Sequence, residues 1–563
     1  MNKSSTSTIK QRVSNDTLFR IGGLVSDRIL ILILVGSIFL FVLYPMIQLI
    51  LRSLLQDDGG YSFATYSMVW RQYGGSLWNS IWVGVVTAVF STAISLGTAL
   101  LISTTRGWIR GLALALLLIT MVSPPFVSSL AYIQLYGRRG LITFRLLGLS
   151  LDPYNAWGVI LMQSISFAPL NALFLNGLLT KIDGNALRSA QDLGASPGAI
   201  MRDIVLPLIR PGILVSLLLG FVRSLADFGT PIIIGGRFNT IASEIYLQFT
   251  GYSDLEKASS LNMFLLLPSV AAFFLYRHFM TRASLLTGAG RSRQEQLELP
   301  LGRAGIHGAL AIAVSALFFT MMILQYASIF ISGFLRNTKD GYILTGQYLR
   351  DLIRYDSATM VRSVWYALIV AVVGTFFAML FAYYMDRRKV AGHHVFDGLA
   401  TLPYMLPGVS FGIAYILAFN SPPIQLTGTA AIVLINMLFK QLPTTTKICS
   451  AALTQIPAAA ERAARDLGAG QFAVLRDIIL PGMRPAFISS FAYNFSSSMT
   501  TAGAIIFLID ASRKVAVFTL FDAVYQGRYA LASLISSLII IIVLLVEGLV
   551  YFISKKEGIR HVS

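Results

Sequence analysis

The sequence carries little charge and almost no cysteine. Only 12% of the 563 residues are Asp, Glu, Lys or Arg, whereas 55% are apolar, and a soluble domain typically carries about 25% charged residues. A chain this apolar is not disordered. The single cysteine, Cys449, has no partner for an intrachain disulfide. The composition therefore excludes a soluble globule and a disulfide scaffold, and it favours an integral membrane protein.

Patterns for metal binding and catalysis are also missing. None of the five histidines lies at a two-ligand helical spacing beside a carboxylate or thiol, so we expect no metal site. No nucleophile stands with a base and an orienting group, which disfavours a membrane enzyme and leaves no catalytic residue to name. The net charge of +18 comes from basic residues scattered between apolar runs, so we attribute it to cytoplasmic loops and expect no nucleic-acid partner.

Twelve apolar runs have the length of membrane-spanning helices. The first six lie near 29–51, 78–104, 109–136, 157–180, 209–235 and 261–280, and the second six near 307–335, 360–385, 395–419, 428–452, 485–510 and 530–554. The first run is long and has no small-residue cleavage site after it, so we do not expect a cleaved signal. With both termini placed inside, Lys and Arg are more frequent on the inner segments, which predicts cytoplasmic termini.

The two halves of the chain repeat each other. Ser80 and Trp82 match Ser363 and Trp365 at an offset of 283, and the window 188–211 matches 462–485 at 14 of 24 positions at an offset of 274. Six spans per copy is an even number, so the copies enter the membrane from the same side and are parallel. We expect an all-α integral membrane protein of about twelve transmembrane helices, built as two parallel six-helix repeats.

The repeat also predicts the domain boundaries. Residues 1–280 form the first half and 307–563 the second, and the polar, glycine-containing segment 281–306 forms a cytoplasmic linker.

The best-preserved repeated segment is a cytoplasmic loop between the fourth and fifth spans, about 181–208 in the first half and 453–484 in the second. Each copy reads as a short amphipathic helix, a glycine break, a second helical stretch and a proline. A helix lying on lipid headgroups would explain one such loop. Two copies with the same spacing favour docking to a partner that has twofold symmetry. The candidate docking residues are Arg188, Ser189, Ala190, Gly194, Arg202, Leu206 and Pro207 in the first copy, and Arg462, Ala463, Ala464, Gly468, Arg476, Leu480 and Pro481 in the second.

Both loops resemble the EAA loop of bacterial ABC importer permeases. The pattern of Gly, nine residues, Ile, one residue and Leu-Pro is met from Gly194 and again from Gly468. The family's Glu position is occupied by Arg188 and Arg462, while Glu461 lies one residue early, so a salt bridge made by that Glu is not carried over. The fused two-half form is similar to ferric-iron (FbpB-like) permeases, which also resemble thiamine and aminoalkylphosphonate permeases.

This resemblance implies three separate partners: an ABC ATPase homodimer seated on the two cytoplasmic loops, an extracytoplasmic solute-binding protein, and the lipid bilayer of a bacterial inner membrane. The chain has no GxxxxGK[ST] phosphate-binding loop. We therefore expect no cofactor on this chain, with ATP and Mg²⁺ bound by the partner ATPase. The outer segments around Tyr66 and Tyr348 are candidate docking surfaces for the binding protein, although an interfacial aromatic belt explains them equally well.

Polar residues inside the spans are candidates for the solute pathway, because each ionisable group there costs about 2.5–3.5 kcal/mol. Arg223 and Asp227 are one helical turn apart and either neutralise each other or face the pathway. Lys440 and Lys447 share one face and either attract an anionic solute or extend to the membrane surface. The remaining pathway candidates, which helix packing would also explain, are Gly229, Thr500, Thr501 and Gly503.

Two function classes remain open from the sequence. The first is the membrane subunit of an ATP-driven importer, with ferric iron as the leading solute and phosphonate, thiamine or polyamine behind it. The second is an ion-coupled secondary transporter, which can also be built from parallel six-span repeats. That class requires buried carboxylates, and Asp227 is the only clear one.

Overall fold

The computed structural model describes residues 27–55, 60–150, 152–287, 305–338, 341–510 and 513–556. The rest of the N-terminal segment and most of the expected linker lie outside this part. Of the expected linker, residues 281–287 continue a helix of the first half and residues 305–306 begin a helix of the second.

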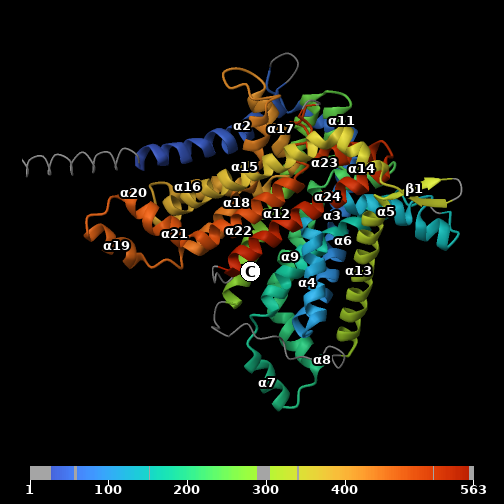
Figure 1. Ribbon diagram of the computed structural model, residues 1–563, viewed down its shortest axis with the longest axis horizontal. Helices are drawn as coiled ribbons and strands as arrows, with labels where there is room; N and C mark the ends of the chain where they lie inside the picture. The colour runs from blue at the N-terminus through green and yellow to red at the C-terminus, as the bar shows by residue number, and fades with distance from the viewer. Residues whose placement is uncertain are drawn as a thin grey trace, which may run out of the picture.

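The first half is helical throughout its spans (Figure 1). Its first span, Asp27–Leu54, contains a π-helical turn η1 (Phe39–Leu43) and ends in α2 (Tyr44–Leu54). The other helical segments are α3 (Ala64–Thr104), α4 (Trp108–Val122), α5 (Val127–Tyr136), η2 (Leu141–Leu146), α6 (Ala156–Leu179), α7 (Gly184–Asp192), α8 (Pro197–Ile200), η3 (Met201–Val205), α9 (Leu206–Ala226), α10 (Gly229–Ile234), α11 (Ile241–Thr250) and α12 (Leu255–Thr287).

The second half repeats this order, with one short hairpin at its outer side. It contains α13 (Gly305–Ser332), β1 (Leu335–Thr338), β2 (Gly341–Leu344), α14 (Gln347–Asp351), η5 (Leu352–Asp356), α15 (Ser357–Ala382), η6 (Tyr383–Arg387), α16 (His393–Met405), α17 (Gly408–Phe419), α18 (Ala430–Leu453), α19 (Ala458–Asp466), α20 (Gln471–Val474), η7 (Leu475–Ile479), α21 (Leu480–Gly482), α22 (Arg484–Thr500), α23 (Ala516–Tyr525) and α24 (Tyr529–Lys556). Strands β1 and β2 pair antiparallel, with Leu335 opposite Leu344.

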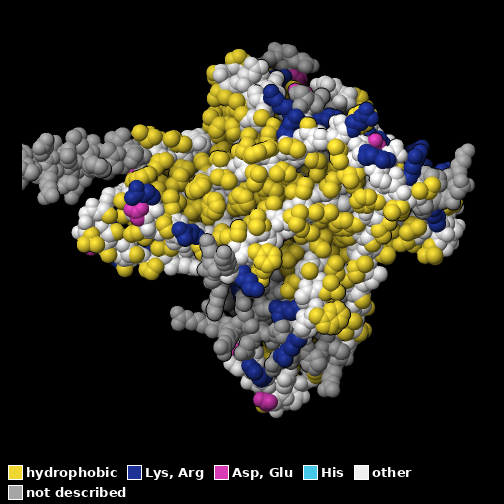
Figure 2. Space-filling view, in the orientation of Figure 1, with side chains coloured by type: hydrophobic (Ala, Val, Ile, Leu, Met, Phe, Trp, Pro, Cys, Tyr) yellow, Lys and Arg dark blue, Asp and Glu magenta, His cyan; other side chains and the backbone are white. Residues whose placement is uncertain are grey.

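Each of the twelve expected spans overlaps helix, but α22 ends at Thr500, so residues 501–510 of the expected span near 485–510 are not helical. Among the described residues, eight helices are long and apolar enough to cross a membrane, and two bent helix pairs raise the number to ten. The remaining two expected spans, near 428–452 and 485–510, are the more polar helices α18 and α22. Figure 2 shows apolar side chains covering the middle of the molecule, with Lys and Arg gathered toward its ends, as a surface surrounded by lipid requires.

The third span of each half is broken, where the sequence predicted continuous helices over 109–136 and 395–419. The chain bends by 108° between α4 and α5 and by 114° between α16 and α17. Pro124 and Pro125 lie in the first break and Pro407 in the second. Proline donates no backbone hydrogen bond and disfavours helix at the residue before it, so these residues end the helix inside the membrane.

The two halves interlock through their first helices. The first span packs against α16, α17 and α18 of the second half, where the Tyr415 hydroxyl donates to the Phe41 carbonyl at 2.6 Å. Helix α13 likewise packs against α3 and α5 of the first half, where the hydroxyls of Ser123 and Tyr326 are 2.8 Å apart. The halves therefore form one body in which each holds the other's first helix.

Equivalent hydrogen bonds confirm the repeat in three dimensions. Ser80 accepts from the backbone N–H of Ile241 at 2.8 Å, and its counterpart Ser363 accepts from the N–H of Ala516 at 2.7 Å. Each bond holds the start of a short helix, α11 or α23, against the second span of its half. Helix α11 therefore corresponds to α23 at an offset of 275.

Candidate functional site

The two expected docking loops have the same backbone structure. In the first, α7 is followed by α8, η3 and α9, and in the second α19 is followed by α20, η7 and α21. Figure 1 shows α7 and α19 at the tips of two separate arms of the molecule, away from α11, α14 and α23. The two arms thus carry equivalent helices at their tips.

Glycine ends both docking helices in the left-handed conformation. Gly194 has φ +86° and Gly468 has φ +88°, a region that residues with a Cβ rarely occupy. The next N–H folds back, from Ala195 to the Ala190 carbonyl and from Ala469 to the Ala464 carbonyl, each at 2.9 Å. This is the 6→1 bond of a Schellman cap. Gly194 and Gly468 therefore end the helices, and the carbonyls of Ala190 and Ala464 accept the capping bonds.

The Leu-Pro pair in each loop follows a π-helical turn. The N–H of Leu206 bonds to the carbonyl of Met201, and the N–H of Leu480 bonds to that of Leu475. Pro207 and Pro481 come next, and neither has an N–H to donate. Each loop thus shifts its hydrogen-bond register immediately before the prolines that start the fifth span.

The docking helices expose the same face. Arg188, Ser189, Arg462 and Ala463 are exposed, and Ala190 and Ala464 are half-buried. At the end of this face Leu193 is 88% exposed and its counterpart Leu467 is 90% exposed. A leucine side chain so fully in water on a charged, cytoplasmic-type loop gains free energy when a partner covers it.

Each π-helical turn contains an arginine, Arg202 in η3 and Arg476 in η7. The guanidinium of Arg202 contacts Asp203 at 2.8 Å, and that of Arg476 contacts Asp477 at 2.6 Å. All four side chains are more than half exposed, so these pairs contribute little to folding. Each loop therefore has an exposed arginine and an exposed aspartate at the same position of the repeat.

The loops differ in how they are attached. Leu187 of α7 is buried in a small apolar cluster, whereas its counterpart Glu461 of α19 is buried against Arg387 at 2.6 Å. The next residue, Arg388, contacts Asp27 of the first span at 2.5 Å. Glu461, the residue that precedes the family's Glu position, therefore has an intramolecular partner, and charged contacts link α19 to the first span.

An aromatic cluster joins the halves at the centre of the molecule. Its members are Phe126, Phe228, Tyr246, Phe507 and Phe521. Tyr246 and Phe521 are equivalent in the repeat, and their ring centroids lie 5.6 Å apart. Residues related by a twofold axis can touch only close to that axis, so the cluster lies on the pseudo-twofold axis of the molecule.

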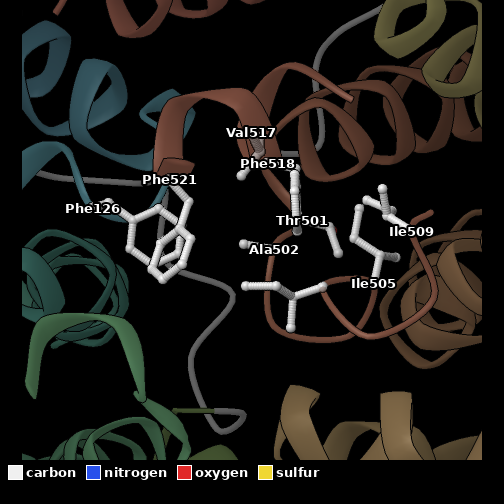
Figure 3. A pocket seen from close by; sticks show the side chains of 9 residues that line it. Phe126, Thr501, Ala502, Ile505, Ile509, Val517, Phe518 and Phe521 are labelled. Atoms are coloured by element: carbon white, nitrogen blue, oxygen red, sulfur yellow. The ribbon is translucent and has the colours of Figure 1, made fainter. Parts of the chain in front are cut away.

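Figure 3 shows part of this cluster bordering a small apolar pocket. The rings of Phe126 and Phe521 lie together, with centroids 5.0 Å apart, and Thr501 and Ala502 also line the pocket. The buried rings of Phe228 and Phe507 fill the adjacent space. The cluster closes the axis against polar solutes in this conformation.

The two pathway glycines lie at this cluster. A Cβ on Gly229 would fall 2.0 Å from Cε1 of Phe126, which no real contact allows. A Cβ on Gly503 would fall 3.5 Å from Cε1 of Phe228, an ordinary contact. Gly229 is therefore required by the close approach of Phe126, whereas Gly503 leaves room for a small side chain.

The two candidate threonines bond within their own segment. The hydroxyl of Thr500 donates to the Ser496 carbonyl at 2.9 Å, and that of Thr501 donates to the Ser497 carbonyl at 2.6 Å.

Arg223 and Asp227 do not form the neutralising pair that their spacing suggested. Helix α9 ends at Ala226, so Asp227 is no longer one helical turn from Arg223. The Asp227 carboxylate accepts from Gln163 at 3.0 Å and from the N–H of Thr230 at 3.1 Å. Within the described ranges no carboxylate lies at ion-pair distance from Arg223, whose guanidinium stacks 4.6 Å from the Phe167 ring.

The two lysines of α18 have separate partners. The ammonium of Lys440 donates to the carbonyls of Pro403 at 2.7 Å and Leu406 at 2.6 Å, where α16 ends at the bend. A cation is favourable at a helix C-terminus, so Lys440 stabilises the broken span. Lys447 is exposed and contacts Asp397 at 3.0 Å. These contacts explain both lysines without an anionic solute.

We expect Lys440→Met to destabilise the protein. The change leaves two carbonyls at the bend without their donor, and each unsatisfied buried group costs about 1–3 kcal/mol. Thermal unfolding of the purified chain in detergent should shift down by several degrees. Lys447→Gln is the matched control, because an exposed pair contributes about 0–1 kcal/mol. Equal shifts in the two variants would contradict the bend-stabilising role.

The tyrosines of the two expected docking segments, Tyr66 and Tyr348, are both half-buried. Tyr66 is half-buried, with its hydroxyl 2.8 Å from that of Ser53. Tyr348 lines a cavity of about 1210 Å³ between the end of α5, helix α13 and the start of α24. Arg138, Asp351 and Arg528 line the same cavity, so it joins segments of both halves.

Sequence reasoning missed several of these residues. Leu193 and Leu467 belong to the repeated Asp-Leu-Gly-Ala segment, and their signal was the repetition of an apolar residue beside a glycine break. The aromatic cluster gave no signal, because its five members come from five separate segments. Glu547, which interacts with Ser496 from within α24, is a second carboxylate in a span besides Asp227.

Comparison with known proteins identifies the family. The model of the binding-protein-dependent transport system inner membrane component matches residues 91–285 and again 374–556. The ferric transport system permease protein FbpB of Actinobacillus pleuropneumoniae is 30% identical over 95% of this chain and 78% of its own length. FbpB 1 of Haemophilus influenzae is 32% identical over 86% of this chain and 78% of its own. The molybdenum permease protein ModB of H. influenzae is 28% identical over 38% of this chain and 95% of its own.

The two matches fall on the two halves, and each includes one docking loop, one pathway glycine and one short axial helix. The chain therefore belongs to the binding-protein-dependent transport system inner membrane components, as a fused two-half permease of an ABC importer.

Proposed function

We propose that this permease moves ferric iron across the bacterial inner membrane, with both termini in the cytoplasm. Two relatives that the chain matches over 78% of their length are named for ferric transport, and this carries the choice of solute. Phosphonate, thiamine or polyamine remains the alternative. The shorter match to a 2-aminoethylphosphonate permease protein of Salmonella paratyphi A, 28% identical over 46% of the chain, supports phosphonate among these.

An ABC ATPase homodimer would bind the two docking loops from the cytoplasm, and an extracytoplasmic binding protein would deliver the solute. The observation that supports the first contact is the matched exposure of Leu193 and Leu467 beside identical glycine caps. ATP and Mg²⁺ would be bound by that ATPase and by no residue of this chain. The bilayer surrounds the apolar belt, and no nucleic acid is expected.

The pathway would run along the pseudo-twofold axis through the aromatic cluster. Hydrolysis on the ATPase would move the two arms that carry α7 and α19, and the cluster would separate as the halves move. Gly229, Gly503 and Thr501 lie where the rings must part. Lys440 and Lys447 have structural partners and are not proposed to contact the solute.

Uptake of radioactive ferric iron into proteoliposomes tests the function. The permease is reconstituted with the ATPase and binding protein encoded beside it. We expect uptake that requires ATP and the binding protein. Uptake that persists without ATP under a proton gradient would favour the secondary-transporter class, and uptake of 2-aminoethylphosphonate alone would replace the solute.

Arg202 and Arg476, the arginines of the two π-helical turns, give a second test. Reversing both charges, with Arg202→Glu and Arg476→Glu, places a carboxylate beside Asp203 and Asp477 on the partner-facing loops. We expect normal membrane insertion, loss of most uptake, and ATP hydrolysis that no longer responds to the loaded binding protein. Lys555→Glu, an exposed charge at the end of α24, is the control that should leave all three unchanged. Unaltered uptake in the double variant would remove these arginines from the contact.

A further inference from the structure

Arg223 is a cation inside the membrane whose guanidinium forms no ion pair with any described carboxylate; Asp227 acts on it only at longer range. It lies in the last turn of α9, and in the described part of the chain no Asp or Glu lies within ion-pair distance. Its Nη1 atom is buried and has no hydrogen-bond acceptor. The face of Phe167, 4.6 Å away, supplies some attraction but no acceptor. A charge placed this way is costly unless a partner supplies acceptors.

The position of Arg223 is close to the axis. Five residues after it on the same segment, Phe228 enters the aromatic cluster. The repeat equivalent of Arg223 is Ser497 of α22, so the first half alone supplies a positive charge at this level. A positive charge present in only one half is not needed to build the repeat, which favours a role in the pathway.

Tyrosines of both halves complete the site. Tyr404 of α16 and, from α9's own segment, Asp227 both interact electrostatically with Arg223, and Tyr404 is 42% exposed. Its ring lies 6.3 Å from that of Tyr276 on α12. Arg223 thus comes from the first half and Tyr404 from the second, and both lie where α9, α12 and α16 meet. A guanidinium and phenolic hydroxyls all offer N–H or O–H donors.

We propose that Arg223 and Tyr404 bind an oxyanion group of the passing solute. A donor set with a fixed positive charge and no carboxylate at ion-pair distance disfavours a bare metal cation and binds the oxygens of a phosphate or carboxylate. The inference rests on the proposed function in one respect: if ferric iron is the cargo, it passes this point in an anionic complex with such a ligand. The site lies where both halves contribute, so its two parts separate when the halves move.

Charge-selective cysteine labelling tests the site without measuring transport. The natural chain is suited to this, because its one cysteine, Cys449, is fully buried. A reporter is introduced as Tyr404→Cys, and a second, for the case in which the first does not fold, as Ser497→Cys. Each is labelled, in the reconstituted complex, with an anionic sulfonatoethyl and a cationic trimethylammonioethyl methanethiosulfonate. The ratio of the two rates reports the local potential.

We expect the anionic reagent to be favoured, and Arg223→Gln to lower the anionic-to-cationic ratio by about tenfold, because a unit charge a few ångströms away in a partly dry site is weakly screened. Arg223→Lys should keep most of the ratio. With the Ser497→Cys reporter, which keeps Tyr404, inorganic phosphate should slow labelling in the chain with Arg223 and not in Arg223→Gln. A ratio that Arg223→Gln leaves unchanged, or no labelling of either reporter, would overturn the proposal.

Uptake measurements separate this proposal from the proposed function. If labelling behaves as expected but ferric iron is not transported, the oxyanion site stands and the choice of solute fails. If iron is transported equally well by the natural chain and Arg223→Gln, the proposed function stands and the oxyanion site is overturned. Arg223→Lys should retain more iron uptake than Arg223→Gln, a difference that loss of packing against Phe167 alone would not produce.

Discussion

Replacing Leu193 and Leu467 together by Asp is expected to release the ATPase and abolish uptake. Covering one leucine side chain contributes about 1.5–3 kcal/mol, which corresponds to roughly 10- to 100-fold in affinity for each loop. Both side chains are almost fully exposed, so the change should not disturb folding of the permease. The measurement is the amount of ATPase that co-purifies with the permease, together with ATP-dependent uptake.

A matched control exists on the outer hairpin. Leu344 of β2 is also strongly exposed, at 80%, and lies at the opposite end of the second half from α19. Leu344→Asp should leave the amount of bound ATPase unchanged. The single variants Leu193→Asp and Leu467→Asp should each retain part of the binding. If the double variant still binds the ATPase at natural levels, the exposed leucines are not the contact.

Gly229→Ala is expected to be the most damaging small substitution in the pathway. Its Cβ would fall 2.0 Å from Cε1 and 2.5 Å from Cδ1 of Phe126. Phe126 has little freedom to withdraw, because its backbone is left-handed, with φ +77°, and its ring packs against Phe228 and Phe521. Overpacking of this kind costs about 1–3 kcal/mol. We expect a lower midpoint of thermal unfolding and loss of most uptake.

A second substitution should restore stability. Removing the obstructing ring with Phe126→Ala in the Gly229→Ala background leaves the new methyl group space, so the unfolding midpoint should recover toward that of Phe126→Ala alone. Gly177→Ala in α6 is the control, because a Cβ there meets nothing within 4 Å. Damage by Gly229→Ala that Phe126→Ala leaves unrelieved would show that the ring is not the cause.

Local patterns predicted the backbone of the two repeated loops and the repeat itself well, because these depend on near neighbours in the sequence. The glycine break at Gly194 and the Leu-Pro pair at Pro207 each fix their own backbone. The position of the spans follows from apolar length, which the lipid requires of any such helix. Even the polar helices α18 and α22 were found, because their counterparts in the first half are more apolar.

Contacts between distant segments could not be predicted in the same way. From the sequence, Lys440 was expected either to attract an anionic solute or to extend to the membrane surface. Its partners in the structure are backbone carbonyls, and backbone groups carry no sequence signal. The spacing of Arg223 and Asp227 suggested a pair only while the helix was assumed to continue past Ala226. The aromatic cluster depends on the meeting of two halves, and only the equivalence of Tyr246 and Phe521, known once α11 and α23 are aligned, identifies it as axial.

The unequal attachment of α7 and α19 has a mechanical consequence. A displacement of α19 reaches the first span through two adjacent arginines, Arg387 and Arg388, whereas the corresponding position of α7, Leu187, packs in an apolar cluster. Equal movements of the two subunits of the proposed ATPase homodimer would therefore move the two halves of this chain by different amounts. Two copies of one half-length polypeptide could not diverge in this manner. A single gene that encodes both halves keeps them in equal number and leaves each free to specialise.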